Sequence, residues 1–360
     1  MLKNILKKAE NEEELLNNEI LYLLDLTDKD DLELLYNTAY KIKKKYVGEK
    51  VYLRGIVELS NYCIKDCYYC GIRKSNAKIR RFIMKEEEIL KAAEFAFKVG
   101  YGSIVLQSGE RQDKQFVEFI EDILIKIKKM SAGKLGITLS LGEQDEKTFL
   151  RWFNAGARRY LLRIETSNSS LYKKIHPLDH DFDKRKQCLN SLKKIGYQVG
   201  TGVLIGIPYQ TLDHLLEDLI FFKKTDVDMI GMGPYVVHED TPLGEKACEL
   251  FNSDAQLELG LKMIALARII LKDVNIASTT ALQALDPLGR EKGLKAGANI
   301  IMPNITDMEY RKDYQLYNNK PCINEDPVLC QGCLESRIKS IGEEIGFNEW
   351  GDSPHFNKSR

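Results

Sequence analysis

Short apolar runs alternate with amphipathic helical segments along most of this chain of 360 residues. Helices are predicted between the apolar runs, as at 86–99, where apolar residues repeat at helical spacing from Ile89 to Phe97. Strands are predicted at 51–59, 104–107, 136–141, 159–165, 198–205, 227–232, 275–279 and 299–302. Eight strands, each followed by a crossover segment, are typical of a complete (β/α)8 TIM-type barrel.

The segments on either side of this pattern are predicted to extend the barrel. Residues 1–48 are charged and helical, and Gly48 is a suitable stop. One helical face there carries Leu32, Leu35, Ala39, Ile42 and Tyr46. We therefore divide the chain into an N-terminal helical extension (1–48), the barrel (49–305) and a C-terminal extension (306–360).

Charge and hydropathy exclude two classes of partner. The 53 basic and 53 acidic residues balance, so net charge gives no case for nucleic acid. No apolar run reaches the length of a membrane span, and the N-terminus lacks the apolar core of an export signal. We therefore expect a cytoplasmic protein, in which cysteines serve metal or catalytic roles more often than disulfides.

Three cysteines, Cys63, Cys67 and Cys70, follow the first predicted strand with the spacing C-x3-C-x2-C. Thiolates are the ligands of iron–sulfur clusters, and three of them can hold a [4Fe-4S] cluster while one iron stays open. An open metal position is typical of a catalytic site rather than a structural one. Loops that follow barrel strands carry active sites, which is where this motif stands.

Other interpretations of this motif stay open. The three thiols could bind zinc together with a histidine, but the nearest histidine in sequence, His176, lies far along the chain. Disulfides are disfavoured, because three is an odd number and close spacing at a turn strains the geometry. Chance spacing among eight cysteines is a further alternative.

Polar residues also collect at the predicted carboxyl ends of other strands. They are Gln107–Glu110 after strand two, Thr138 and Ser140 on one face of strand three, and Ser278–Thr280 at the end of strand seven. Their common position predicts a lumen that binds a polar ligand.

Strand four, predicted at 159–165, places Arg163 and Glu165 on the same side by strand alternation. Charges inside a barrel are costly unless they are paired or bound to a ligand. We favour a polar ligand, and an internal salt bridge or a strand end turned to solvent is the alternative.

A second group of cysteines, Cys322, Cys330 and Cys333, stands in the C-terminal extension with the spacing C-x7-C-x2-C. Three thiolates again suit a metal or a small iron–sulfur cluster. Ordinary free thiols on a loop are the alternative.

The first cysteine motif, with Tyr69 before its last cysteine, resembles the radical S-adenosylmethionine superfamily. Further segments resemble the HydE family of [FeFe]-hydrogenase maturases: 105–110, 138–143, 160–166, 231–234 and 298–304. The resemblance extends from about residue 30 to 350. The tail cysteines match an accessory cluster of some family members, taken here as [2Fe-2S].

The resemblance implies a [4Fe-4S] cluster on Cys63, Cys67 and Cys70, with S-adenosyl-L-methionine on its open iron. Reductive cleavage would then give methionine and a 5′-deoxyadenosyl radical. The residues implied to hold S-adenosylmethionine are Tyr69, Ser108, Glu110, Glu165 and Arg185. Those implied to line the substrate site are Gln107, Thr138, Arg163, Thr279, Thr280, Tyr314 and Tyr317, with Arg163 also taking part in catalysis.

The substrate implied by the resemblance is a cysteine-bound iron carbonyl–cyanide complex, whose sulfur the radical attacks during assembly of the diiron part of the hydrogenase cofactor. Its carboxylate would suit Arg163. The implied partners are an electron donor such as ferredoxin or flavodoxin and the other hydrogenase maturases, and the implied state is a monomer.

Three rivals remain. A related enzyme could act on an amino acid, as methylornithine synthase does, or on dethiobiotin, as biotin synthase does. The tail cysteines and the segment 162–166 favour HydE over both, and the predicted strands carry no cysteine for a second cluster inside the barrel. An iron–sulfur electron carrier, from another class, would need neither a polar lumen nor S-adenosylmethionine contacts.

Overall fold

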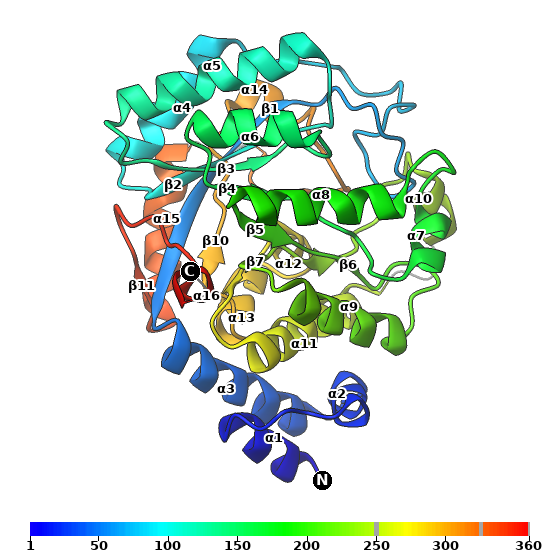
Figure 1. Cartoon of the computed structure of the whole chain (residues 1–360). Coiled ribbons are helices and arrows are strands. Elements are labelled where there is room, and N and C mark those ends of the chain that lie inside the picture. The colour runs from blue at the N-terminus through cyan, green and yellow to red at the C-terminus, as the bar shows by residue number, and fades with distance from the viewer. Residues whose placement is uncertain (248–251, 324–326, 359–360) are drawn as a thin grey trace.

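The computed structural model describes residues 1–247, 252–323 and 327–358, and a curled parallel sheet lies at its centre (Figure 1). Eight strands follow one another in the order β10-β1-β2-β3-β4-β5-β7-β9. Their bounds are β1 Lys50–Ser60, β2 Ser103–Ser108, β3 Gly136–Ser140, β4 Arg159–Leu161, β5 Gln198–Thr201, β7 Met229–Ile230, β9 Asn275–Ile276 and β10 Ile300–Ile301. The coarse prediction of a parallel α/β sheet is thus confirmed.

Backbone hydrogen bonds also connect β9 with β10, the first and last strands of this order. Asn299 N donates to Ile276 O at 2.9 Å, and Ser278 N donates to Ile300 O at 2.8 Å. A parallel bridge joins Ala277 to Ile300. The two ends of the sheet therefore lie within bonding distance of each other.

Helices follow most strands and cover the outside of the sheet (Figure 1). The helices that follow the central strands are α4 Glu86–Lys98, α5 Lys114–Met130, α6 Glu146–Asn154, α7 Ser169–Ile175, α8 Phe182–Ile195, α9 Leu212–Thr225, α10 Pro242–Ala247, α11 Ser253–Leu271, α12 Thr280–Leu285 and α13 Gly289–Lys295. The predicted helices are found within a few residues of these bounds.

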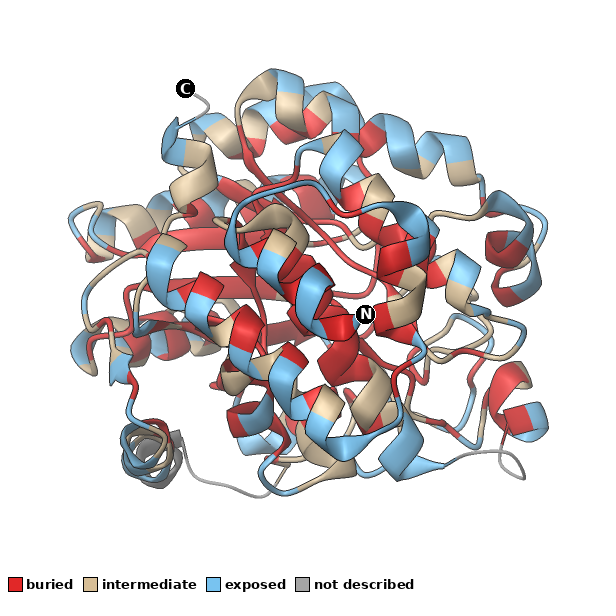
Figure 2. Cartoon of the chain, turned by 90° about the horizontal axis from the view of Figure 1, so that it is seen from below, coloured by how far each residue is buried: buried red, intermediate tan, exposed pale blue. Residues whose placement is uncertain are grey.

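Local sequence explains where several helices begin. The carboxylates of Asp113, Asp145 and Asp181 accept hydrogen bonds from backbone N–H groups in the first turns of α5, α6 and α8. The apolar faces of the helices turn toward the sheet, and Figure 2 shows buried residues concentrated there and along the strands.

Several strands end earlier than the apolar runs predict, as β7 does at Ile230 and β9 at Ile276. The run 159–165 forms a strand only to Leu161, and beyond it Glu165, which has a left-handed backbone with φ 67°, returns to the sheet in a single bridge to Val203. The run 198–205 divides into β5 and a short β6 (Leu204–Ile205), which pairs with β8 (Gly233–Pro234). At Gly202 the chain passes so close to Gly231 that a Cβ would lie 2.2 Å from its carbonyl oxygen.

The two ends of the chain pack around the sheet. The N-terminal helices are α1 Leu2–Glu10, α2 Asn17–Leu24 and α3 Lys29–Tyr46, and α3 packs on α11. The C-terminal elements are α14 Met308–Arg311, α15 Pro327–Ser340, β11 Glu344–Ile345 and α16 Pro354–Lys358, and β11 pairs with β1. Within the described ranges, no helix is long and apolar enough to cross a membrane.

Candidate active site

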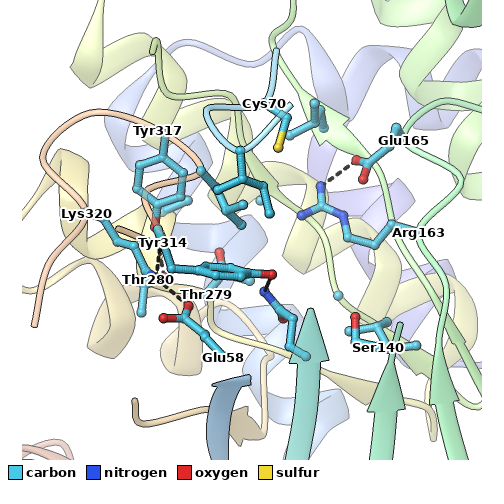
Figure 3. A pocket seen from close by; sticks show the side chains of 18 of the residues that line it. Glu58, Cys70, Ser140, Arg163, Glu165, Thr279, Thr280, Tyr314, Tyr317 and Lys320 are labelled. Atoms are coloured by element: carbon cyan, nitrogen blue, oxygen red, sulfur yellow. Dashed lines mark hydrogen bonds and ion pairs between the residues drawn. The ribbon is translucent and has the colours of Figure 1, made fainter. Parts of the chain in front are cut away.

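A cavity of about 310 Å³ opens at the carboxyl ends of the strands (Figure 3). Residues from the loops after β1, β2, β4 and β9 line it, together with a segment that follows α14. Most of the predicted site residues meet there: Cys63, Cys67, Tyr69, Cys70, Gln107, Ser108, Glu110, Arg163, Glu165, Arg185, Thr279, Thr280, Tyr314 and Tyr317. The parallel strands bring these distant segments together because they all end at one edge of the sheet.

The cysteine loop leaves β1 at a β-bulge. Glu58 and Ser60 pair with consecutive residues of β2, Gln107 and Ser108, so β1 contains one extra residue there. Beyond the bulge, Asp66 binds Arg73 in a bidentate ion pair at 2.9 and 2.7 Å, which closes the loop on itself. A β-bulge re-aims the chain, and here it directs the loop over the cavity.

All three thiols of the loop line the cavity. Burial raises the pKa of Cys67 to about 12 and raises the pKa values of Cys63 and Cys70 as well. The backbone N–H of Glu110 donates to Cys63 Sγ at 3.3 Å, an interaction that stabilises a sulfur bearing negative charge. Three cysteines that line one cavity, one of them already hydrogen-bonded, suit by their chemistry a cluster that deprotonates its ligands on binding.

A group of four charges lies beside the cysteines. Glu143 is fully buried and contacts Lys65 Nζ and Arg185 Nη1, both at 3.0 Å. Glu110 lies 3.6 Å from Lys65 and 3.5 Å from Arg185. Two cations and two carboxylates in one place fit the ammonium and carboxylate of an amino-acid ligand.

These four charges shift one another's pKa values. Burial acts to raise the pKa of both carboxyls and prevails at Glu110, whereas Arg185 and Lys65 outweigh it at Glu143 and lower that pKa. Burial acts to lower the pKa of Arg185 and Lys65, but Glu110 and Glu143 outweigh it and raise both. The opposite charges therefore stabilise the ionised forms of Glu143, Lys65 and Arg185.

Arg163 and Glu165 form an ion pair at 2.9 Å on the cavity wall (Figure 3). Both residues follow the end of β4 at Leu161, and Glu165 has a left-handed backbone. Arg163 also donates to Val203 O, and its own carbonyl accepts from Arg185 Nε at 2.7 Å. The sequence left an internal salt bridge and a polar-ligand site as alternatives for this pair. In the structure the two residues form a salt bridge and also line the cavity.

Two histidines contact the cysteine loop, although both are remote in sequence. His176 Nε2 lies 3.2 Å from the hydroxyl of Tyr69, and its Nδ1 lies 2.9 Å from Tyr172 O. His180 Nε2 accepts from the backbone N–H of Asp66 at 3.1 Å. Both are far from the cysteines in sequence, but α7 and its following loop fold back onto the cysteine loop.

The lumen side of the cavity carries neutral hydrogen-bonding groups. Gln107 Nε2 donates to the hydroxyl of Tyr314 at 3.3 Å, and the hydroxyls of Thr280 and Tyr317 lie 2.9 Å apart. Ser108 donates to Gly109 O at 2.6 Å. This half of the cavity is suited to a polar ligand that forms hydrogen bonds with neutral groups as well as ion pairs.

Comparison with known proteins agrees with this arrangement. The model of the radical SAM superfamily matches residues 57–222. The [FeFe] hydrogenase maturase subunit HydE of Thermotoga maritima is 43% identical over 97% of this chain and 97% of its own. The chain belongs to the HydE family. It is a radical SAM enzyme of hydrogenase maturation, a membership that implies a [4Fe-4S] cluster and S-adenosylmethionine.

Other relatives share the scaffold of this HydE family member. A 3-methylornithine synthase of Methanosarcina acetivorans is 29% identical over 84% of this chain and 83% of its own. The crystal structure of methylornithine synthase (PylB) superposes with a TM-score of 0.81 at 25% identity, over 96% of this chain and 98% of that one. The curled parallel sheet is thus of the radical SAM type.

Thr138 does not reach the main cavity. It lies beneath it, in a smaller cavity lined by Arg54, Arg159, Tyr160, Gln198, Gly200 and Met229. Ser140, two residues further along β3, lines the main cavity instead. Alternation predicted the correct face of β3, but the depth of each residue depends on where the cavity ends.

Of the tail cysteines of this HydE family member, neither Cys322 nor Cys333 lines that cavity. Cys322 is buried, with φ 66°, and Cys333 is exposed. The side chain of Cys330 lies outside the described residues. Their joint role as a cluster site therefore stays a prediction.

Four residues of the site were missed in the sequence. Lys65 stands between two of the motif cysteines, and Glu143 directly follows β3, so their positions were available signals. Glu58 and Lys320 form an ion pair in the lumen with side-chain exposures of 2% and 7%. Neither shows a motif, and only the folded chain brings them together.

Proposed function

We propose that this enzyme cleaves S-adenosylmethionine reductively and acts on a sulfur-containing, cysteine-bound iron carbonyl–cyanide substrate during assembly of the diiron part of the H-cluster. One observation carries the proposal: the three cysteines, the polar lumen and three of the four charges (Lys65, Glu110 and Arg185) line a single cavity, with Glu143 buried behind them. The maturase function named for the Thermotoga maritima relative supports it.

The residues present fit the implied cofactors. Cys63, Cys67 and Cys70 would hold the [4Fe-4S] cluster. Tyr69, Ser108, Glu110, Glu165 and Arg185 would hold S-adenosylmethionine, and the structure adds Lys65 and Glu143 as their ionic partners. The bound cluster would supply the electron that splits the sulfonium of S-adenosylmethionine into methionine and a 5′-deoxyadenosyl radical.

The chain's own residues bind, orient and exclude water. Arg163 would hold the carboxylate of the substrate, and its pairing with Glu165 fixes the direction of its guanidinium. Gln107, Thr279, Thr280, Tyr314 and Tyr317 would contact the rest of the substrate. An enclosed site protects a reactive intermediate from side reactions.

The proposal also covers the barrel, its extensions, the partners and the tail cysteines. We propose a complete (β/α)8 barrel over 49–305, supported by the bonds between β9 and β10, with extensions at 1–48 and 306–360. We also propose a monomer served by ferredoxin or flavodoxin and by the other maturases. Cys322, Cys330 and Cys333 would hold an accessory [2Fe-2S] cluster that is not needed for S-adenosylmethionine cleavage.

A second candidate is an enzyme that acts on a free amino acid. The 3-methylornithine synthase similarity favours it, since the scaffold is common to both. Incubation of the reduced enzyme with S-adenosylmethionine and a mixture of free amino acids separates the two candidates: an amino-acid enzyme would consume one of them, whereas the proposed enzyme would consume none.

The proposal is tested by anaerobic reconstitution with iron and sulfide, reduction with dithionite, and chromatographic detection of 5′-deoxyadenosine. We expect product in the wild type, none in Cys63→Ala, and nearly unchanged product in Cys330→Ala. A reducible cluster whose spectrum is blind to S-adenosylmethionine would overturn the proposal in favour of an electron carrier. Equal loss in both variants would show that the tail site is not accessory.

A further inference from the structure

One wall of the cavity is built by the C-terminal part of the chain and not by the sheet. Residues 313–322, here called the wall segment, follow α14 and line the cavity with Tyr314, Leu316, Tyr317, Lys320 and Pro321. Figure 3 shows Tyr317 and Lys320 on the side of the cavity away from Arg163. The wall segment therefore forms the lumen surface that faces the proposed carboxylate site.

Most attachments of the wall segment are single neutral hydrogen bonds. The hydroxyls of Tyr314 and Tyr317 contact Gln107 and Thr280. Backbone bonds join Gly71 N to Leu316 O and Asn318 N to Val237 O, both at 3.0 Å. Each such bond contributes modestly to the position of the segment.

The ion pair between Lys320 and Glu58 is the charged attachment within the cavity. Lys320 Nζ contacts Glu58 Oε1 and also donates to Tyr314 O at 2.9 Å. Asn304 Nδ2 donates to the other oxygen of Glu58 at 3.0 Å. One ammonium thus ties the start of the wall segment and its end to β1.

A closed circuit of buried bonds reinforces this tie. The backbone N–H of Glu58 donates to Thr306 Oγ1 at 2.8 Å, and Arg311 Nε donates to Thr306 O at 2.7 Å. Arg311 Nη1 donates to Cys322 O at 2.8 Å, two residues beyond Lys320. The end of the wall segment is therefore connected to Glu58 by two routes.

We infer that Glu58 and Lys320 are positioning residues that set the place of Tyr314 and Tyr317 against the substrate; the inference rests on the proposed function. Apolar residues would fill such a buried place at no loss of stability, because desolvating two charges costs about as much as their attraction returns. The paired ammonium adds geometric specificity, because its hydrogen bonds require the wall segment to lie where Lys320 can reach particular oxygen atoms. Its role is to align the lumen wall.

Hydrogen–deuterium exchange on the reconstituted protein with S-adenosylmethionine tests the inference without relying on turnover. In Lys320→Met we expect exchange in peptides of the wall segment, and at Gly71, whose N–H is bonded to it, to rise about tenfold or more, while β2 and residues 63–70 stay unchanged. Lys320→Arg should restore wild-type exchange. Lys312→Met is the matched control, because Lys312 is exposed on the same stretch of chain.

Kinetics give the second readout. With the cysteine-bound iron carbonyl–cyanide complex as substrate, Lys320→Met should raise KM about tenfold and lower kcat far less. Unchanged exchange in the wall segment, or a rise spread over the whole barrel, would overturn the inference. If the wild type forms no 5′-deoxyadenosine, the proposed function fails, whereas the exchange result still decides whether the pair positions the wall.

Discussion

Arginines lie both at the edge of the sheet where the strands end and at the edge where they begin, but the guanidinium groups have different partners at the two edges. At the carboxyl end, Arg185 meets the carboxylates of Glu110 and Glu143, which raise its pKa above the ordinary value against the effect of burial. At the opposite end, burial and mutual repulsion lower the pKa of Arg54 beside Arg159. There the donors meet mainly backbone carbonyls, since Arg54 Nη2 donates to Gly351 O and Arg159 Nη1 to Trp350 O, and Arg159 adds one ion pair with Asp352 at 3.3 Å.

This difference suits the carboxyl edge of the sheet to ligand binding and the opposite edge to stabilising the fold. Ion pairs at the cavity can exchange partners with a charged ligand, because each carboxylate and each cation has a counterpart in an amino acid. The carbonyls of the C-terminal segment and the carboxylate of Asp352 do not line the ligand cavity and offer no such exchange. Changes at the carboxyl end should therefore alter ligand affinity, and changes at the opposite end should alter stability.

The largest effect is expected from Arg185→Met. It removes the cation shared by Glu110 and Glu143, and lost charged hydrogen bonds cost about 1.5–3 kcal/mol each. We expect S-adenosylmethionine affinity of the reconstituted protein, measured by calorimetry, to fall about 100-fold. Lys186→Met, on an exposed position of α8, is the control. Unchanged affinity in Arg185→Met would remove the distinction between the two ends.

A smaller loss, in stability only, is expected from Gly351→Ala. Gly351 has φ 62°, and a Cβ there would lie 2.4 Å from Tyr52 Cγ. Strain and overpacking together should lower the free energy of unfolding by about 2 kcal/mol, as followed by denaturant titration. Gly342→Ala is matched, since it has φ 75° but open space around it, and should cost about 1 kcal/mol. Weaker S-adenosylmethionine binding in Gly351→Ala would show that the two ends are coupled.

The smallest effect concerns His355, which joins Asp226 at 2.7 Å and Asp273 at 3.1 Å near the C-terminus. Its hydrogen bond to Asp273 leads the causes that raise its pKa from 6.5 to about 9. Because the folded pKa is raised, the charged form stabilises the fold fully below pH 6.5, and this contribution disappears as pH rises through about 9. Since the side chain is partly exposed, we expect about 1 kcal/mol.

The measurement is the unfolding free energy of wild type and His355→Gln across pH. The difference between them should be present near pH 6 and should close by about pH 10. A difference that stays constant with pH would show that the histidine acts by packing and not by charge.

Much of the fold was predictable because periodicity is a local property. The strand–helix order and the faces of α3 and α4 follow from residues a few positions apart. The limits of β4 were not predictable, since the apolar run 159–165 shows no turn signal at Leu161, where the strand ends. Short pairs such as β6 with β8 depend on distant backbone and leave no periodic trace.

The site likewise has features that follow from local sequence and features that depend on contacts between distant residues. The cysteine spacing and the polar strand ends could be read directly, because a cluster motif is contiguous and parallel strands end at one edge. The ion pairs Lys65–Glu143 and Glu58–Lys320, and the contact of His176 with Tyr69, join residues that are far apart in sequence. Pairing over such separations arises only when packing brings the groups within bonding distance, and no local pattern encodes that distance.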